Sequence, residues 1–252
     1  MIGRAESPTS LRLLGLFCLT CLLVLLDSLP VNAATLRVAV SSNFADAARS
    51  LVKEYEANSE HQVILLVGST GKHYAQIQNG LVVDVFLAAD RARPELLEAN
   101  KKGIAGTRFT YAVGRLVLWS ASGQVDETTL AKVQLERIAI ANPKIAPYGL
   151  AAEQSVAAMG LMPALAKNFV HGENVAQAFQ FVTTKNARYG FVALAQVKAR
   201  HENYWLVPAS LHDLIEQQAI LVRDSDAGRS LLAFLRSDKA KKLIQQHGYD
   251  TP

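Results

Sequence analysis

Short apolar runs alternate with helically spaced apolar residues from residue 36 onward. The runs have the length of strands and lie at 36–40, 61–67 and 82–88. Helical stripes follow them at 44–57, 72–78 and 91–99. Because strands that alternate with helices form sheets joined by right-handed crossovers, this half of the chain predicts an α/β unit.

A second alternation of the same kind begins at residue 115. Strand-like runs lie at 115–120, 137–141, 189–194 and 219–222, with a short extended piece at 206–208. Helices are predicted at 151–159, 174–183, 225–236 and 238–247. The sequence shows no repeat of solenoid period and no low-complexity linker between the halves. We therefore expect two α/β lobes that close about a hinge, with a ligand in the cleft at the carboxyl ends of the strands.

The residues before this pattern are predicted to be a secretory signal peptide. Arg4 and Arg12 precede an apolar run at 13–26, and small residues lead to a cleavage position after Ala33. The alternative is an uncleaved membrane anchor. The run of about 14 residues is shorter than the ~20 that span a bilayer, so we favour a leader over 1–33 and a periplasmic mature chain.

Cysteine and charge narrow the function classes. The two cysteines, Cys18 and Cys21, both lie in the leader. They are not preceded by the small residues of a lipoprotein signal. The mature chain then has no disulfide, no Cys-based catalysis and no iron–sulfur site. The net charge of +4 is spread without a long Lys/Arg run, which argues against a nucleic-acid partner.

Four polar loops stand directly before predicted helices. They read Val40-Ser41-Ser42-Asn43-Phe44, Gly68-Ser69-Thr70-Gly71, Pro147-Tyr148-Gly149 and Gly172-Glu173-Asn174-Val175. The first N–H groups of a helix have no intrahelical acceptor, and the helix dipole adds partial positive charge there. Such positions favour anions, so we expect the four loops to converge on one small oxyanion.

The candidate ligands are Ser42, Asn43, Ser69, Thr70, Tyr148 and the backbone of Val175. Each signal alone also fits a simpler role: Ser42 and Asn43 as helix caps, Tyr148 as a packed aromatic residue. The Gly-Ser-Thr-Gly-Lys stretch lacks the spacing of a nucleotide phosphate loop. Lys72 could steer anions or could be a solvated residue of the first helical turn.

Neutral donors suffice for such a site. A hydrogen bond to a charged group contributes about 1.5–3 kcal/mol net. Six or seven of them exceed the ~8 kcal/mol of micromolar binding even after the costs of ordering and closure. A balancing arginine is therefore not required, and no direct metal ligand and no cofactor is expected.

Catalysis finds little support in the sequence. The histidines of the chain form no metal-ligand pair, and no nucleophile elbow is present. One hypothesis is an exported hydrolase or transferase that uses Ser69 and His73, but we favour His73 on a helix surface. Asp84 and Asp90 are interpreted as a strand-edge residue and a cap. We expect a binding protein, not an enzyme.

Six segments together carry a resemblance to a known family. They are Val-Ser-Ser-Asn-Phe at 40–44, Gly-Ser-Thr-Gly-Lys-His-Tyr-Ala-Gln-Ile at 68–77, Asp-Val-Phe-Leu-Ala-Ala-Asp at 84–90, Asn-Pro-Lys-Ile-Ala-Pro-Tyr-Gly at 142–149, Gly-Glu-Asn-Val-Ala-Gln-Ala at 172–178 and Gly-Phe-Val-Ala-Leu-Ala-Gln at 190–196. The mature chain resembles, over essentially its whole length, the periplasmic molybdate-binding proteins of ABC transporters.

The resemblance implies a two-lobed periplasmic binding protein of the type II solute-binding fold. It also implies a discontinuous first lobe, which we place at 34–112 and 218–252, with the second lobe at 113–217. It further implies a monomer that captures molybdate or tungstate as an oxyanion and delivers it to a membrane permease.

Two positions depart from the family pattern. Asn43 stands where a Ser commonly binds the oxyanion, and Ala193 stands where some members have a ligand Tyr. Tyr148 is expected to supply that hydroxyl from the opposite wall. Sulfate or another tetrahedral oxyanion is the alternative ligand. Phosphate fits less well, because its proton needs an acceptor that no loop clearly supplies.

Overall fold

The computed structural model describes residues 33–133, 135–198 and 203–252. Residues Ala34–Pro252 form one compact unit. The predicted signal peptide, apart from its last residue, lies outside the described part of the chain. Within the described ranges, no helix has the length and apolar character that crossing a bilayer would need.

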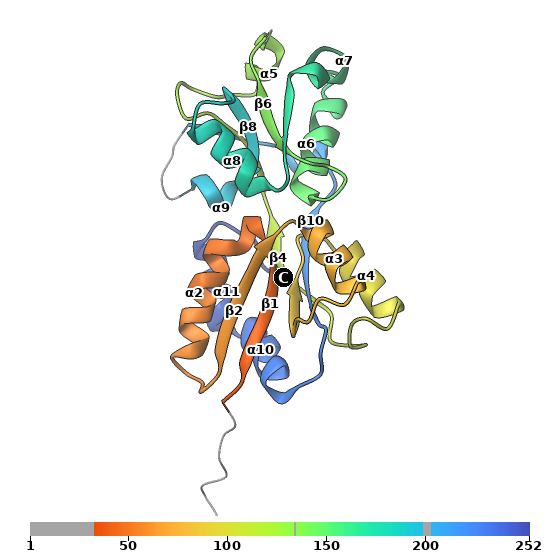
Figure 1. The fold of residues 1–252 in the computed structure, drawn as a ribbon. Coiled ribbons are helices and arrows are strands. Elements are labelled where there is room, and N and C mark those ends of the chain that lie inside the picture. Colours follow the sequence, from red (N-terminus) through yellow and green to blue (C-terminus); the bar gives the residue numbers. More distant parts are fainter. Residues whose placement is uncertain (1–32, 134, 199–202) are drawn as a thin grey trace, which may run out of the picture. The chain divides into compact units, whose positions relative to one another are not determined.

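A first five-stranded sheet is assembled from both ends of this unit (Figure 1). Its strands, in spatial order, are β2 (Gln62–Gly68), β1 (Thr35–Ser41), β3 (Val85–Leu87), β10 (Ile215–Leu221) and β4 (Phe109–Gly114). β1 pairs in parallel with β2 and β3, whereas β10 is antiparallel to β3 and β4. The parallel strands β1, β2 and β3 therefore end at the same edge.

Helices cover both faces of the first sheet. One face packs against α2 (Ala45–Glu56), α10 (Asp226–Arg236) and α11 (Asp238–Gln246). The other packs against α3 (Thr70–Gln78) and α4 (Ala92–Ala99). Strand alternation explains this division, since Val38 and Val40 point into the first core and Ala39 into the second.

A second five-stranded sheet is built from the middle of the chain. Its order is β7 (Phe169–Gly172), β6 (Ile138–Ala141), β8 (Tyr189–Ala193), β5 (Leu116–Trp119) and β9 (Tyr204–Leu206). The helices α6 (Pro147–Ala158) and α8 (Val175–Thr183) pack on it. Shorter helical pieces are η1 (Ser42–Phe44), α5 (Thr129–Lys132), α7 (Met162–Leu165), η2 (Ala166–Asn168), α9 (Leu194–Val197) and η3 (Ala209–Leu211).

The α/β class is confirmed, and the differences from the predicted elements are local. Strands β4 and β7 were not predicted, and α6 begins at Pro147 instead of 151. Only Arg115 separates β4 from β5, so the chain passes from one sheet to the other without a loop. The predicted lobe boundaries at 112 and 217 fall inside β4 and β10, and the division at these positions stays a prediction.

Candidate ligand-binding site

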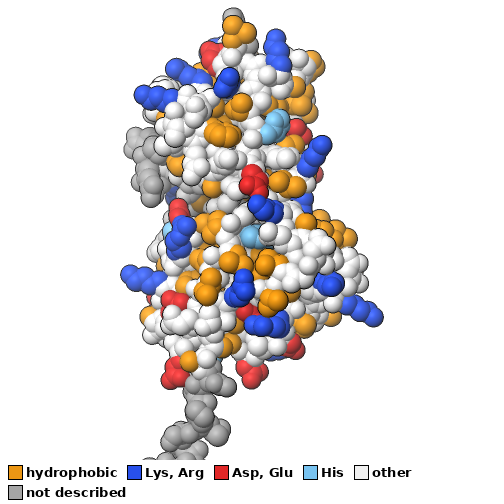
Figure 2. All heavy atoms as spheres, in the orientation of Figure 1, with side chains coloured by type: hydrophobic (Ala, Val, Ile, Leu, Met, Phe, Trp, Pro, Cys, Tyr) orange, Lys and Arg blue, Asp and Glu red, His pale blue; other side chains and the backbone are white. Residues whose placement is uncertain are grey.

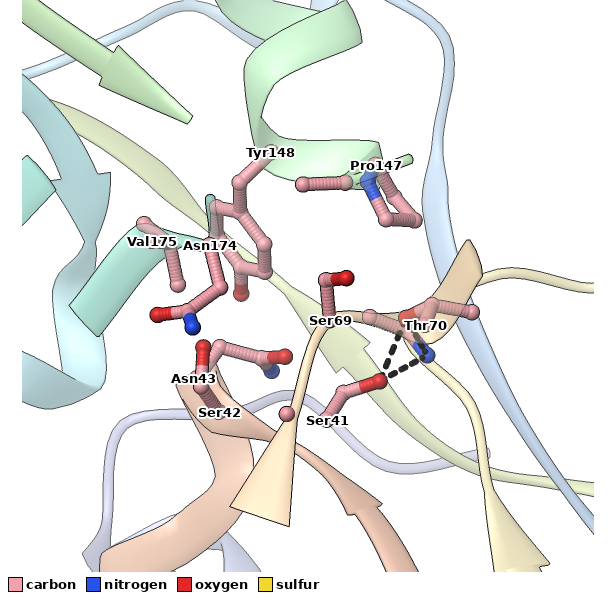
Figure 3. A pocket seen from close by; sticks show the side chains of 12 residues that line it. Ser41, Ser42, Asn43, Ser69, Thr70, Pro147, Tyr148, Asn174 and Val175 are labelled. Atoms are coloured by element: carbon pink, nitrogen blue, oxygen red, sulfur yellow. Dashed lines mark hydrogen bonds between the residues drawn. The ribbon is translucent and has the colours of Figure 1, made fainter. Parts of the chain in front are cut away.

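One pocket lies where loops of the two sheets meet (Figure 3). It is lined by Ser41, Ser42, Asn43, Gly68, Ser69, Thr70, Ala89, Ala146, Pro147, Tyr148, Asn174 and Val175. All six residues proposed from the sequence are in this set. The cavity volume of about 10 Å³ is far below the ~300–1,000 Å³ of pockets for drug-sized molecules. The pocket therefore suits a ligand of only a few atoms.

The first wall of the pocket consists of the lining residues that follow β1, β2 and β3, namely Ser41, Ser42, Asn43, Gly68, Ser69, Thr70 and Ala89. They gather because the three strands are parallel neighbours that end at one edge of the sheet. This is the usual place for a ligand in an open α/β sheet.

Hydroxyl groups within the first wall hold one another. The Ser41 and Thr70 hydroxyls are hydrogen-bonded, and the Ala89 N–H donates to both oxygens at 3.1 Å. Thr70 is thus fixed in place by partners inside the wall. Ser41 and Ala89 were missed from the sequence. Ser41 adjoins the predicted Ser42, and Ala89 follows β3, so the position after each parallel strand was the available signal.

The Asn43 side chain was expected to contact the ion, but its amide is bound to other residues of the protein. Its Nδ2 donates to Gln217 Oε1 at 2.8 Å and to the Tyr249 hydroxyl at 3.3 Å. Both amide hydrogens are thereby engaged with residues outside the pocket lining. The Tyr249 hydroxyl donates to the Asn43 carbonyl at 2.6 Å. The donor that Asn43 can still offer is its backbone N–H in the first turn of η1.

The second wall consists of the lining residues at the starts of α6 and α8, namely Ala146, Pro147, Tyr148, Asn174 and Val175. Asn174 caps α8, since its side chain accepts from Gln177 N at 3.1 Å. The next donor, Ala176 N, crosses to Ser42 Oγ at 3.4 Å. The N–H of Val175 is the first of α8 and has no acceptor within the helix.

Tyr148 enters the pocket from α6, with its hydroxyl directed toward the loop of Ser42 and Asn43 (Figure 3). The side chain is buried, and the hydroxyl oxygen has no hydrogen-bond partner among the described residues. Burial, with the nearby Tyr249 and Tyr111, raises the pKa of Tyr148 well above its usual value. The phenol therefore keeps its proton and can donate it in a hydrogen bond.

The site carries no formal charge of its own, since every residue that lines the pocket is neutral. The cation Lys72 at its rim is bound by Glu173, with Nζ and Oε1 2.5 Å apart. On the face shown in Figure 2, Lys and Arg side chains lie interspersed with Asp and Glu. Attraction for an anion must then come from N–H and O–H donors and from the starts of η1, α3, α6 and α8.

His73 contradicts the expectation of a residue on a helix surface. Its side chain is buried, and its ring packs on Phe86 and lies directly behind Gly68. Burial lowers the pKa of His73, so the imidazole is neutral at pH 7. It does not line the pocket that holds Ser69. Its signal in the sequence was the helical spacing to buried Ile77, four residues on.

The carboxylates of Asp84 and Asp90 lie on residues that flank β3. Asp90 is a cap as expected, with Oδ1 accepting from Arg93 N at 3.0 Å. Asp84 directly precedes β3, as expected of a strand-edge residue, and its buried carboxylate is ion-paired with Arg223. Among the described residues, no group of three or more His, Cys, Asp and Glu side chains could hold a metal ion.

The family model of bacterial extracellular solute-binding proteins matches residues 36–250. The chain belongs to that family. This solute-binding protein is 44% identical over 228 residues to the molybdate-binding protein ModA of Azotobacter vinelandii, covering 86% of this chain and 90% of that protein. It is 37% identical over 230 residues to ModA of Rhodobacter capsulatus, covering 89% and 91%.

A solved structure supports the same membership. The periplasmic molybdate-binding protein of Azotobacter vinelandii superimposes with a TM-score of 0.83 at 36% identity, over 86% of this chain and 99% of that one. The two-sheet architecture of this solute-binding protein is therefore that of a periplasmic binding protein, as the sequence predicted.

Proposed function

We propose that this protein captures molybdate, and tungstate in the same way, outside the cytoplasm and delivers it to the permease of an ABC importer. The observation that carries the proposal is the neutral pocket in which donors from both sheets converge. The identity of the relatives supports the choice of ion, since two proteins named for molybdate binding share more than a third of their residues with this chain.

The chemistry of the donors favours an unprotonated tetrahedral dianion. Hydroxyl and backbone N–H groups line the pocket, and no carboxylate does. A phosphate that carries a proton would find no strong acceptor for it, whereas a fully ionised oxyanion needs donors only. The Val175 and Asn43 N–H groups, the Tyr148 hydroxyl and the Ser69 hydroxyl are proposed to contact the ion.

Calorimetric titration of the mature chain with molybdate at neutral pH tests the proposal. We expect saturable binding at one site with a dissociation constant of about micromolar, since four hydrogen bonds to a charged group contribute about 6–12 kcal/mol before the costs of ordering and closure. Tungstate should bind similarly, and sulfate should compete poorly. Absence of both heat and a molybdate-induced rise in melting temperature would refute molybdate capture, and stronger binding of sulfate would reassign the ion.

The remaining parts of the proposal concern the state of the protein. We expect it to act as a monomer, to catalyse no reaction on the ion it binds and to require no cofactor. Release of molybdate unchanged from the loaded protein, as judged by its ultraviolet spectrum, checks the second point. Sedimentation of the loaded protein checks the first.

A further inference from the structure

Next to the pocket, the segments that carry its two walls are joined by a hydrogen bond between backbone atoms. The Gly71 N–H, in the first turn of α3, donates to the Ile145 carbonyl at 2.8 Å. Gly71 directly follows Ser69 and Thr70 of the first wall, and Ile145 directly precedes Ala146 and Pro147 of the second. A displacement at this contact therefore displaces the groups that line the pocket.

This contact leaves no room for a side chain at Gly71. A Cβ placed there would lie 2.8 Å from Ile145 Cα and 2.9 Å from the Ile145 oxygen. Both are backbone atoms, so rotation of a side chain cannot relieve the overlap. The backbone of Ile145 is itself held in a turn, since Ile145 N and Ala146 N both donate to Asn142 O, at 3.1 and 2.9 Å.

Glycine has no local reason to occupy this position. Gly71 lies in a helix, where alanine is more favourable by about 1 kcal/mol. It is absent from the residues with positive φ. The absence of a side chain is explained by the approach of the second wall.

We propose that Gly71 and Ile145 set the width of the pocket by limiting how closely the two walls approach, and so determine which ion both walls can contact together. This inference rests on the proposed function. Neither residue lines the pocket, so both are positioning residues. A methyl group at Gly71 holds Ser69 and Thr70 away from Tyr148, and a small ion then contacts one wall at a time.

The test compares molybdate binding by the mature wild-type chain with Gly71→Ala, Gly71→Val and the control Lys72→Ala. Overpacking of this kind should raise the dissociation constant about tenfold or more for Ala, and further for Val. The increase should appear in the dissociation rate. Lys72→Ala alters the same helical turn without a steric change, and loss of its exposed ion pair should cost at most about fivefold.

Two further measurements separate this role from a structural one. Without molybdate the lobes of a hinged binding protein can open and relieve the overlap at Ile145, so the melting temperature of ligand-free Gly71→Ala should equal or exceed that of the wild type. In the wild type itself, molybdate should slow hydrogen exchange at the Gly71 amide, which needs no variant. If the wild type binds molybdate, two results would overturn this inference and leave the proposed function intact. One is equally tight binding by Gly71→Ala, and the other is a Gly71 amide whose hydrogen exchange is not slowed by molybdate. Failure of the wild type to bind would overturn the proposed function and the inference with it.

Discussion

The two walls of the pocket use different parts of the chain to present donors. The first wall relies on hydroxyl side chains, of which Ser41 and Thr70 are bound to each other and to Ala89 N. The second wall relies on the first N–H of α8, that of Val175, with Tyr148 as its one hydroxyl. Hydroxyl side chains are thus more numerous in the first wall, with Ser41, Ser42, Ser69 and Thr70 against Tyr148 alone, although each wall also offers one proposed backbone N–H, of Asn43 or of Val175. A conservative substitution should affect the two walls unequally.

Val175→Pro, which removes a backbone donor from the second wall, is expected to have the largest effect on molybdate binding. Proline removes one N–H and suits the first position of a helix, and Asn174 before it already has the extended conformation that proline requires. We expect molybdate binding to weaken by about 1.5–3 kcal/mol, the contribution of one donor to a charged group. Calorimetry measures the change. Val175→Ala keeps the N–H and serves as the control, and equal losses in both variants would show that the side chain matters instead.

Tyr148→Phe examines the one hydroxyl of the second wall. Its loss should weaken molybdate binding by about 1–2 kcal/mol, again measured by calorimetry. Tyr55→Phe is the matched control, because that buried hydroxyl donates to Ala227 O and does not line the pocket. Unchanged affinity in Tyr148→Phe would mean that the backbone alone binds the ion on this side.

A substitution of His73 tests the buried imidazole that packs behind Gly68 of the first wall. Its pKa is lowered by burial in the folded chain, so the unfolded chain takes up the proton more readily. Stability is therefore complete above the unfolded pKa of about 6.5 and falls below it, by no more than ~1.4 kcal/mol per pH unit for one proton. The melting temperature should drop more between pH 7 and pH 5 in the wild type than in His73→Gln. Equal drops would contradict a buried neutral imidazole.

The smallest effects are expected at the ion pair that joins the walls. Lys72 and Glu173 are about half exposed, so their pairing contributes at most ~1 kcal/mol. Glu173→Gln leaves an unpaired cation beside the pocket and should bind molybdate more tightly than Lys72→Gln does. High salt should reduce this difference, since exposed charges are screened. Identical affinities at low salt would show that neither charge reaches the ion.

The sequence allowed the α/β class and the residues around the pocket to be predicted, because polar loops before helices are local features. Whether those residues bind the ion stays a prediction. The direction of the Asn43 amide could not be predicted, since Gln217 and Tyr249, its partners, lie far along the chain. The contact of Gly71 with Ile145 was missed for the same reason, since the start of α3 and the loop before α6 are far apart in the chain.

The hydrophobic pattern also failed to predict a strand that is short and a strand that is followed directly by one of the other sheet. β7 has four residues and includes His171 and Gly172, so its apolar run is too brief to identify. β4 and β5 follow one another across Arg115, and the pair was interpreted as one strand that begins there. The ring of His73 is buried against Gly68 and Phe86. Its helical spacing to Ile77 indicates the buried face of the helix but does not identify these two partners.

The place of β10 between β3 and β4 has a consequence for the order of assembly. All five strands of the second sheet come from one continuous stretch, Leu116 to Leu206, and can pair as soon as that stretch is available. The first sheet cannot be completed until Ile215–Leu221 arrives, although its first strand is Thr35–Ser41. The part of the protein that starts the chain is thus the last to close, and a chain truncated before β10 would leave the edges of β3 and β4 unpaired and open to aggregation.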